Sequence, residues 1–294
     1  ETYYGVAVPG EVGLETDVPA RQATLKAGLP GDSVSLTLDR ACCSSMAAVR
    51  LGYRAIDAGE VALDLGISRE DQDRWAYGSQ MKYAKAFKEG KFVIGEELMR
   101  VEIPQGKRPP IILEQDEFPK PDTTLEKLSK LPLVYGSPTV TAGNAPGLDT
   151  GASAILIMSE KKAKEKGLKP LARIVSMIAT ATTPSFTIQK VLEKAGMSLD
   201  QIDLIEVNEA FAAMPLVSAK ILSNGDPEKM KSILEKTNVN GGAIAIGHPV
   251  GASGARILLT MIYELRRRGG GTGVASICGG LAQGEGAIVQ VDGE

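Results

Sequence analysis

The chain has 294 residues, a formal net charge of -3 and 43% hydrophobic residues. This length suffices for two domains with buried cores, and the near-neutral charge gives no electrostatic basis for binding nucleic acid. Aromatic residues make up only 4% of the chain whereas 33 residues are glycine. This composition favours an α/β protein with tight turns between strands and helices. No apolar run is long enough to span a bilayer, so we expect no membrane insertion.

The first half of the chain predicts a strand over Val34–Leu38, followed by a helix over 44–58 that ends at Gly59. A second helix is expected over 67–90, because Ser68 provides an N-cap before an acidic first turn. Residues 91–135 carry many prolines and charges and predict an irregular surface excursion. The apolar run Gly151–Met158 predicts a strand, and the lysine-rich stretch after it a solvated helix.

The second half opens at Pro170 and follows a similar outline. Helices are expected over Thr187–Ala195 and Ala255–Arg268, and strands over Asp203–Val207, Asn238–Ile246, Gly273–Ile277 and Ala287–Val291. The two halves therefore resemble an imperfect duplication, with domains at 1–169 and 170–294 and an irregular excursion within 61–146. A duplicated unit places equivalent turns face to face across a pseudo-twofold axis.

Few residues in this chain can do acid–base or nucleophilic chemistry. The only histidine is His248, and the cysteines are Cys42, Cys43 and Cys278. Three cysteines do not make a disulfide framework and indicate reduced thiols, as in a cytoplasmic protein. A mitochondrial or peroxisomal location is the alternative if a targeting segment precedes Glu1. Imidazole moves protons near neutral pH and a thiolate is a strong nucleophile, so a Cys–His reaction centre is the leading hypothesis.

Cys42 and Cys43 lie at the predicted strand-to-helix junction, where the helix N-terminus lowers the pKa of a thiol. His248 lies in a glycine-rich turn, 247–254, whose spacing fits neither a dinucleotide-binding nor a P-loop motif. The glycines are better explained by a close backbone turn. The predicted duplication places this turn opposite Cys42.

Four segments, in this order, resemble the thiolase family. They are Asp39-Arg40-Ala41-Cys42-Cys43-Ser44-Ser45, Asn208-Glu209-Ala210-Phe211, Gly247-His248-Pro249 with Gly251-Ala252-Ser253-Gly254, and Cys278-Gly279-Gly280. Weaker support comes from Thr141-Ala142-Gly143-Asn144-Ala145 and Ile67-Ser68-Arg69-Glu70-Asp71-Gln72. The resemblance implies an α/β fold with the five-layered αβαβα architecture of thiolases, built from two similar domains. It also implies an enzyme that makes or breaks a carbon–carbon bond next to a coenzyme A thioester.

The resemblance assigns a role to each candidate residue. Cys42 matches the nucleophile that becomes acylated, whereas Cys43 is expected to be structural. His248 matches the base that activates Cys42, and Cys278 matches the cysteine that exchanges the α-proton. Asn208 matches the residue that holds a water near the enolate oxygen. The backbone N–H groups of Cys42 and Gly280 match a second oxyanion hole.

The coenzyme contacts are expected at Ala210, Phe211 and Pro146, although Pro146 stands where many members have serine. Glu209 is expected only to brace its turn. The resemblance implies acyl-CoA or acetyl-CoA as substrate, no permanently bound cofactor and a homodimer or homotetramer. No metal is expected, because the chain lacks a ligand set for one.

The chain is shorter than thiolases between Glu60 and Val61, and again around Thr183–Thr187. A genuine deletion would leave the coenzyme site incomplete. Two alternatives therefore stay open: a decarboxylating condensing enzyme, which would not need Cys278, and a catalytically impaired binding or scaffold protein of the same fold. A papain-like hydrolase is disfavoured by the glycine-rich α/β layout and by the second cysteine.

Overall fold

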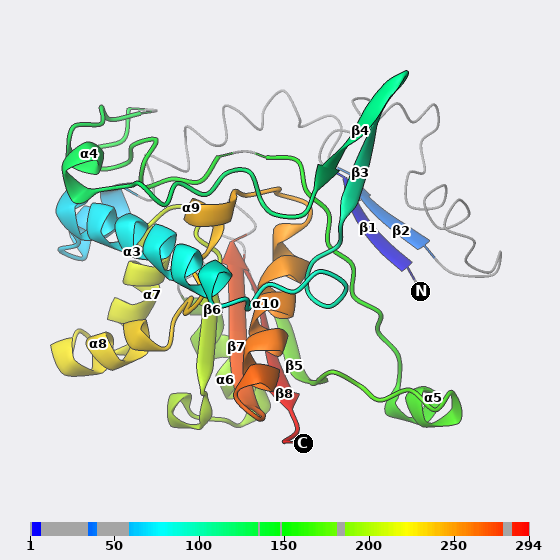
Figure 1. Ribbon diagram of the computed structural model, residues 1–294. Coiled ribbons are helices and arrows are strands. Elements are labelled where there is room, and N and C mark those ends of the chain that lie inside the picture. The colour runs from blue at the N-terminus through cyan, green and yellow to red at the C-terminus, as the bar shows by residue number, and fades with distance from the viewer. Residues whose placement is uncertain are drawn as a thin grey trace.

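A computed structural model describes the strands at 2–6 and 35–39 and residues 59–134, 136–147, 149–180, 186–278 and 284–293. Cys42, Cys43 and Gly280 lie outside these residues, as does the helix expected over 44–58. The described part of the chain has an α/β fold, as expected, and its largest sheet has four strands (Figure 1).

The sheet has the strand order β5–β8–β7–β6. Its strands are β5 (Arg173–Thr180), β8 (Gly284–Val291), β7 (Gly271–Cys278) and β6 (Leu204–Val207). The β6–β7 pair is parallel, and the other two pairs are antiparallel. The predicted strands at 203–207, 273–277 and 287–291 are confirmed, whereas β5 was not foreseen.

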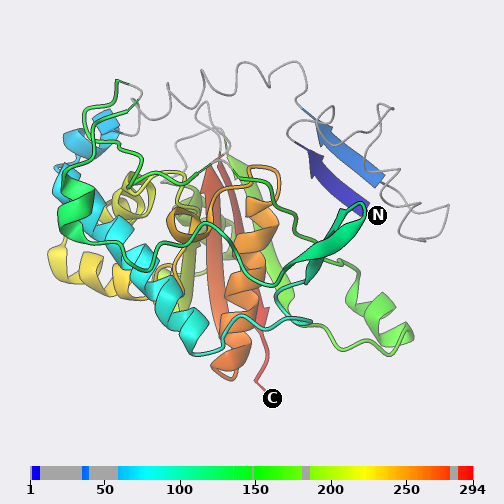
Figure 2. The same cartoon turned by 45° about the horizontal axis from the view of Figure 1, so that its top comes forward.

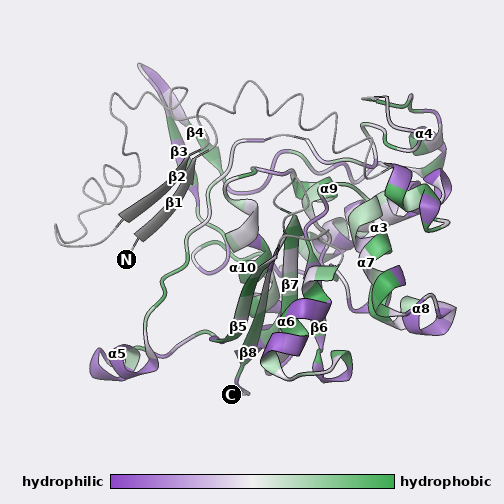
Figure 3. Ribbon diagram, turned by 180° about the vertical axis from the view of Figure 1, so that it is seen from behind, coloured by the Kyte–Doolittle hydropathy of each residue, from purple (hydrophilic) through white to green (hydrophobic). Residues whose placement is uncertain are grey.

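Two helices cover opposite faces of this sheet. Helix α10 (Ser253–Arg267) lies on the face that is turned forward in Figures 1 and 2, and α6 (Thr187–Ala195) lies on the other face, seen in Figure 3. Successive side chains of a strand point to opposite faces of the sheet. Val274 packs in the hydrophobic cluster that includes α6, and Ala275 packs in the cluster that includes α10. Figure 3 shows the strands as hydrophobic and parts of α6 as hydrophilic. Both helices confirm their predictions.

Helix α3 (Arg69–Lys88) begins where the sequence predicts, because its N-terminus is closed by a capping box. Ser68 Oγ accepts from the N–H of Asp71 at 3.1 Å, and Asp71 Oδ2 accepts from the N–H of Ser68 at 2.9 Å. Strands β1 (Thr2–Val6) and β2 (Ser35–Asp39) form a separate parallel pair, so the strand expected near Val34–Leu38 is confirmed within one residue.

The remaining elements are short. They are the hairpin of β3 (Val101–Gln105) and β4 (Arg108–Leu113), helices α4 (Leu125–Ser129), α5 (Glu160–Glu165), α7 (Ala213–Leu222), α8 (Pro227–Glu235) and α9 (Ala243–Ile246), and the 3-10 turn η4 (Leu199–Gln201). The lysine-rich helix is confirmed as α5, whereas the excursion at 91–135 is less irregular than predicted because it contains the hairpin and α4. No helix in the described part of the chain is long and apolar enough to cross a membrane.

Three local predictions were wrong. Gly59 does not end a helix, because residues 59–64 are helical and a Schellman turn closes at Gly66 (φ +66°), with the N–H of Ile67 bonded to the carbonyl of Ala62 at 2.8 Å. The run 151–158 is not a strand. It has no neighbouring strand among the described residues and leaves Leu156 78% exposed.

The third error concerns the segment before His248. Thr237 makes a single parallel bridge to Ile205 of β6, and the chain then turns into α9 instead of extending the sheet. His248 therefore follows a short helix and not a strand.

Candidate active site

Two predicted site residues lie at the carboxyl end of the sheet. Asn208 follows β6 directly, and Cys278 is the last residue of β7. Because β6 and β7 are parallel neighbours, with Val207 opposite Ser276, both residues emerge at the same edge. The N–H of Asn208 donates to the carbonyl of Ser276 at 2.9 Å, which continues the strand pairing to the site.

His248 reaches this edge from the turn before α10. Its side chain is buried, with 6% exposed. The imidazole Nε2 lies 3.4 Å from Nδ2 of Asn208, and Nδ1 lies 2.6 Å from Oγ of Ser253. Two predicted site residues, forty positions apart in the sequence, are thus in polar contact in a buried location.

The position just before His248 favours glycine. Gly247 has φ +94°, and a Cβ at this position would overlap the carboxylate of Asp149. The N–H of His248 donates to the carbonyl of Gly147 at 2.9 Å, and Oγ of Ser153 donates to the carbonyl of Ala252 at 2.6 Å. Gly147 and Ser153 therefore hold the histidine turn in place.

The carboxylate of Glu209 accepts several buried hydrogen bonds, whereas the sequence analysis expected it only to brace its turn. Its side chain is fully buried. Oε1 accepts from Nε1 of Trp75 at 2.9 Å and Nδ2 of Asn238 at 3.1 Å, and Oε2 accepts from Oγ of Ser79 at 2.8 Å and the N–H of Ile244 at 3.0 Å. These bonds tie α3 and α9 to the residue next to Asn208.

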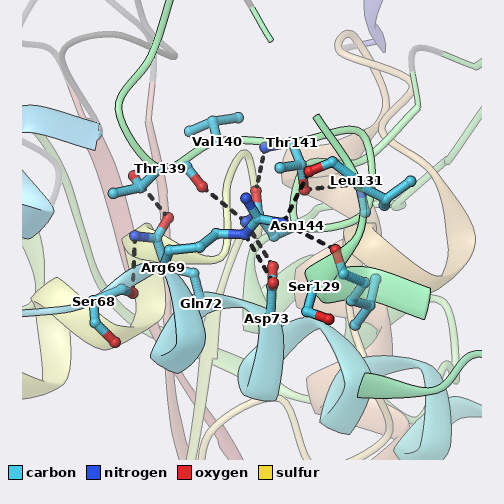
Figure 4. A network of polar contacts seen from close by, with 12 residues as sticks. Ser68, Arg69, Gln72, Asp73, Ser129, Leu131, Thr139, Val140, Thr141 and Asn144 are labelled. Atoms are coloured by element: carbon cyan, nitrogen blue, oxygen red, sulfur yellow. Dashed lines mark hydrogen bonds and ion pairs between the residues drawn. The ribbon is translucent and has the colours of Figure 1, made fainter. Parts of the chain in front are cut away.

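A second network joins the two weaker motifs of the sequence (Figure 4). Asn144 is fully buried, and its Nδ2 donates to Oδ1 of Asp73 in α3 at 3.0 Å. Nε of Arg69 donates to Oδ2 of the same aspartate at 2.8 Å. The N–H of Ala212 donates to the carbonyl of Asn144 at 2.9 Å. The turn at 139–144 is thereby fixed between α3 and the segment that follows Asn208.

A buried charged pair lies behind Asn208. Nη2 of Arg256 in α10 donates to Oδ1 of Asn208 at 3.3 Å, and Nη1 lies 3.8 Å from Oε2 of Glu206. Burial raises the pKa of Glu206 to about 8, against the opposing effect of Arg256. Sequence analysis missed both residues. An arginine within the otherwise apolar start of α10 and a glutamate in a buried strand were the available signals.

The predicted coenzyme contacts lie close to Cys278 and to the histidine turn in the fold. Ala210 and Phe211 are buried in a core cluster against which Cys278 packs. Pro146 is half-buried and precedes Gly147, which accepts the bond from the histidine turn. Cys42 and Gly280 are outside the described residues. Within the described ranges, no group of three or more His, Cys, Asp or Glu residues could hold a metal ion.

Comparison with protein families gives two matches. Residues 168–291 match the model described as "Thiolase, C-terminal domain", and residues 6–63 and 58–161 match that described as "Thiolase, N-terminal domain". The two parts of the second match overlap at residues 58–63, which include Glu60 and Val61, where the sequence is shorter than expected.

Curated relatives carry names of the same kind. The chain is 37% identical to an acetyl-CoA acetyltransferase of Allochromatium vinosum, over 92% of this chain and 83% of the relative. It is 33% identical to a beta-ketoadipyl-CoA thiolase of Acinetobacter baylyi, over 99% and 87%. The first alignment has 337 positions against the 294 residues of this chain, so the relative has additional residues within the aligned region.

Solved structures agree with the sequence comparisons. The fold matches the Bacillus anthracis acetyl-CoA acetyltransferase with a TM-score of 0.83 and 31% identity, and human mitochondrial 3-ketoacyl-CoA thiolase with a TM-score of 0.81 and 32% identity. Each match covers 99% of this chain and 86% of the other. A further match is the human enzyme in complex with CoA, with a TM-score of 0.78.

Proposed function

This chain belongs to the thiolase family, and on that premise we propose that it is a thiolase-type acyltransferase working through an acyl-cysteine. It condenses two acyl-CoA molecules, such as acetyl-CoA, or cleaves a 3-ketoacyl-CoA in the reverse direction. The observation that carries the proposal is the buried contact between His248 and Asn208 at the sheet edge where Cys278 ends its strand.

In the first half-reaction, Nε2 of His248 takes the proton of Cys42, and the thiolate attacks the thioester carbonyl. The backbone N–H groups of Cys42 and Gly280 stabilise the tetrahedral oxyanion, an effect whose loss typically costs about 3 kcal/mol for one donor. Coenzyme A leaves as the thiol with the proton held by His248. The acyl group stays on Cys42.

In the second half-reaction, the thiolate of Cys278 removes the α-proton of a second acyl-CoA. The resulting enolate needs hydrogen-bond donors at its oxygen. A water held by Asn208 supplies one donor, and His248 supplies the other after its Nε2 has taken the proton that ionises Cys278; the 3.4 Å between Nε2 and Nδ2 supports a shared oxygen position. The enolate carbon then attacks the acyl-cysteine, a 3-ketoacyl-CoA is released, and His248 returns its proton to the Cys42 thiolate.

The remaining parts of the proposal concern partners and location. The substrates are coenzyme A thioesters, with Ala210, Phe211 and Pro146 as contacts and no permanently bound cofactor. The domains divide at 169/170, the assembly is a homodimer or homotetramer, and the protein acts in the cytoplasm.

Acetylation of the purified protein tests the mechanism. Incubation with acetyl-CoA followed by intact mass measurement should show one acetyl group on the wild type and on Cys43→Ala, but none on Cys42→Ala. Cys278→Ala should still accept acetyl on Cys42 while losing exchange of the α-protons of acetyl-CoA with deuterium from solvent. A wild-type protein that gains no acetyl group would contradict the proposal, whereas a Cys278→Ala protein that still condenses would point to a condensing enzyme.

A further inference from the structure

We infer that Arg256 and Ser253 are positioning residues that hold neutral His248 as the Nδ1–H tautomer, so that Nε2 keeps its lone pair and serves as the base. The inference rests on the proposed function for its catalytic consequence, but the tautomer itself follows from hydrogen-bond geometry. Polar contacts join four side chains in one series: Arg256, Asn208, His248 and Ser253.

Arg256 sets the direction of the hydrogen bonds at one end of this series. A guanidinium has only donors, so the atom of Asn208 that faces Nη2 at 3.3 Å must be the amide oxygen. The amide nitrogen of Asn208 therefore faces His248, at 3.4 Å from Nε2. Since this nitrogen also has only donors, Nε2 must be the acceptor, and the ring proton belongs on Nδ1.

The contacts at the other end of this series agree with the Nδ1–H tautomer. Oγ of Ser253 lies 3.1 Å from the carbonyl oxygen of Pro249, which has only acceptor capacity. The single hydroxyl proton of Ser253 is used in that bond. Its oxygen is then the acceptor for Nδ1–H of His248, at 2.6 Å. The opposite tautomer would set two N–H groups against each other at Asn208.

Burial fixes which atom donates and which accepts, because buried donors need acceptors. Asn208 and Ser253 are each 1% exposed. Oε2 of Glu206 lies 3.8 Å from Nη1 of Arg256, the guanidinium that orients Asn208. The anchoring serine is the first residue of α10, and Arg256 lies one turn further along the same helix, so a single helix fixes both ends of the series.

The single histidine allows a direct test. After labelling with ¹⁵N-histidine, the long-range ¹H–¹⁵N spectrum of the full chain contains one imidazole and reports its tautomer without further assignment. The wild type should show the Nδ1–H pattern at a pH where the ring is neutral. An Nε2–H pattern in the wild type would overturn the inference.

The variants test each end of the series. Ser253→Ala removes the acceptor at Nδ1, and Arg256→Met with Glu206→Gln removes the donor and the neighbouring buried carboxyl group together. Each should make the Nε2–H form detectable, and their combination should increase its share. Controls are Ser223→Ala, whose Oγ also donates to a backbone carbonyl (Lys220, 3.0 Å) in a buried position, and Arg268→Lys at the C-cap of the same helix. If both variants and their combination keep the wild-type tautomer, the inference is wrong.

Exchange of acetyl-CoA α-protons adds a kinetic measurement. The Ser253 variant and the Arg256/Glu206 variant should slow exchange about 10- to 100-fold, less than the roughly 10²–10³-fold reported for deleting an oxyanion donor outright. In an Asn208→Ala background the Arg256/Glu206 change should have no further effect, because Arg256 acts through Asn208. Failure of the wild type to acetylate Cys42 with the Nδ1–H tautomer in place would reject the proposed function and leave the positioning role standing.

Discussion

Replacing Glu209 by glutamine tests whether the buried bonding group beside the site holds α3, α9 and β6 together. The carboxylate accepts four hydrogen bonds, two at each oxygen. Glutamine has one oxygen and one NH2 group of nearly the same size, so the change removes acceptors without creating a cavity.

Neither orientation of the glutamine amide satisfies its neighbours. With NH2 at the Oε1 position it faces the donors of Trp75 and Asn238. With NH2 at the Oε2 position it faces the N–H of Ile244, while Oγ of Ser79 already accepts from the N–H of Gly242 at 3.0 Å. The first orientation loses two of the four bonds, whereas the second loses the bond from Ile244 and reverses that from Ser79, whose Oγ can accept a second hydrogen bond.

The magnitude follows from the orientation that loses fewer bonds. A hydrogen bond to a charged group contributes about 1.5–3 kcal/mol, so one lost bond lowers the free energy of unfolding by about that amount. For a chain of this size a loss of that order lowers Tm by about 3–12 °C, at roughly 2–4 °C per kcal/mol.

Thermal unfolding followed by circular dichroism measures this change. Glu193→Gln, at an exposed position of α6, is the matched control and should leave Tm within about 1–2 °C of the wild type, as expected for a surface substitution. A Glu209→Gln protein with the same Tm as the control would refute the reasoning, since it would mean that the four donors find equivalent acceptors elsewhere.

Three further predictions concern other parts of the fold. Gly247→Ala should destabilise the chain and abolish acyl transfer together, because the new Cβ overlaps Asp149 and φ +94° is strained for alanine; retained activity and an unchanged Tm would contradict this. Ser68→Ala should lower the free energy of unfolding by about 1 kcal/mol through loss of the α3 cap, measured by urea titration against Ser129→Ala in exposed α4. Burial alone would raise the pKa of Glu264, but hydrogen bonds from Asn240, Arg268 and Arg267 lower it from 4.5 to about 2. The stabilisation is therefore complete above pH 4.5 and is lost as pH falls through about 2, so Glu264→Gln should flatten the acid limb of a stability–pH curve over that interval.

The sequence by itself determined the elements whose signals are local. The capping box at Ser68, the periodic apolar residues of α6 and α10 and the short runs of small and apolar residues in β7 and β8 specify their structures through neighbours only a few positions away. It also singled out His248 and Cys278 as candidates, because a chain with one histidine and three cysteines offers few choices, whereas Asn208 came from the resemblance to thiolases.

Only the tertiary structure decided which long-range partners these residues meet. The parallel pairing of β6 with β7 brings Asn208 beside Cys278, and the docking of α10 brings His248 and Arg256 to the same edge. The apolar run at 151–158 has strand-like composition but no neighbouring strand among the described residues, and a strand exists only through its hydrogen-bond partner. Glu209 and Arg256 look like ordinary charged residues in the sequence, because their importance comes from burial and from donors and acceptors supplied by distant segments.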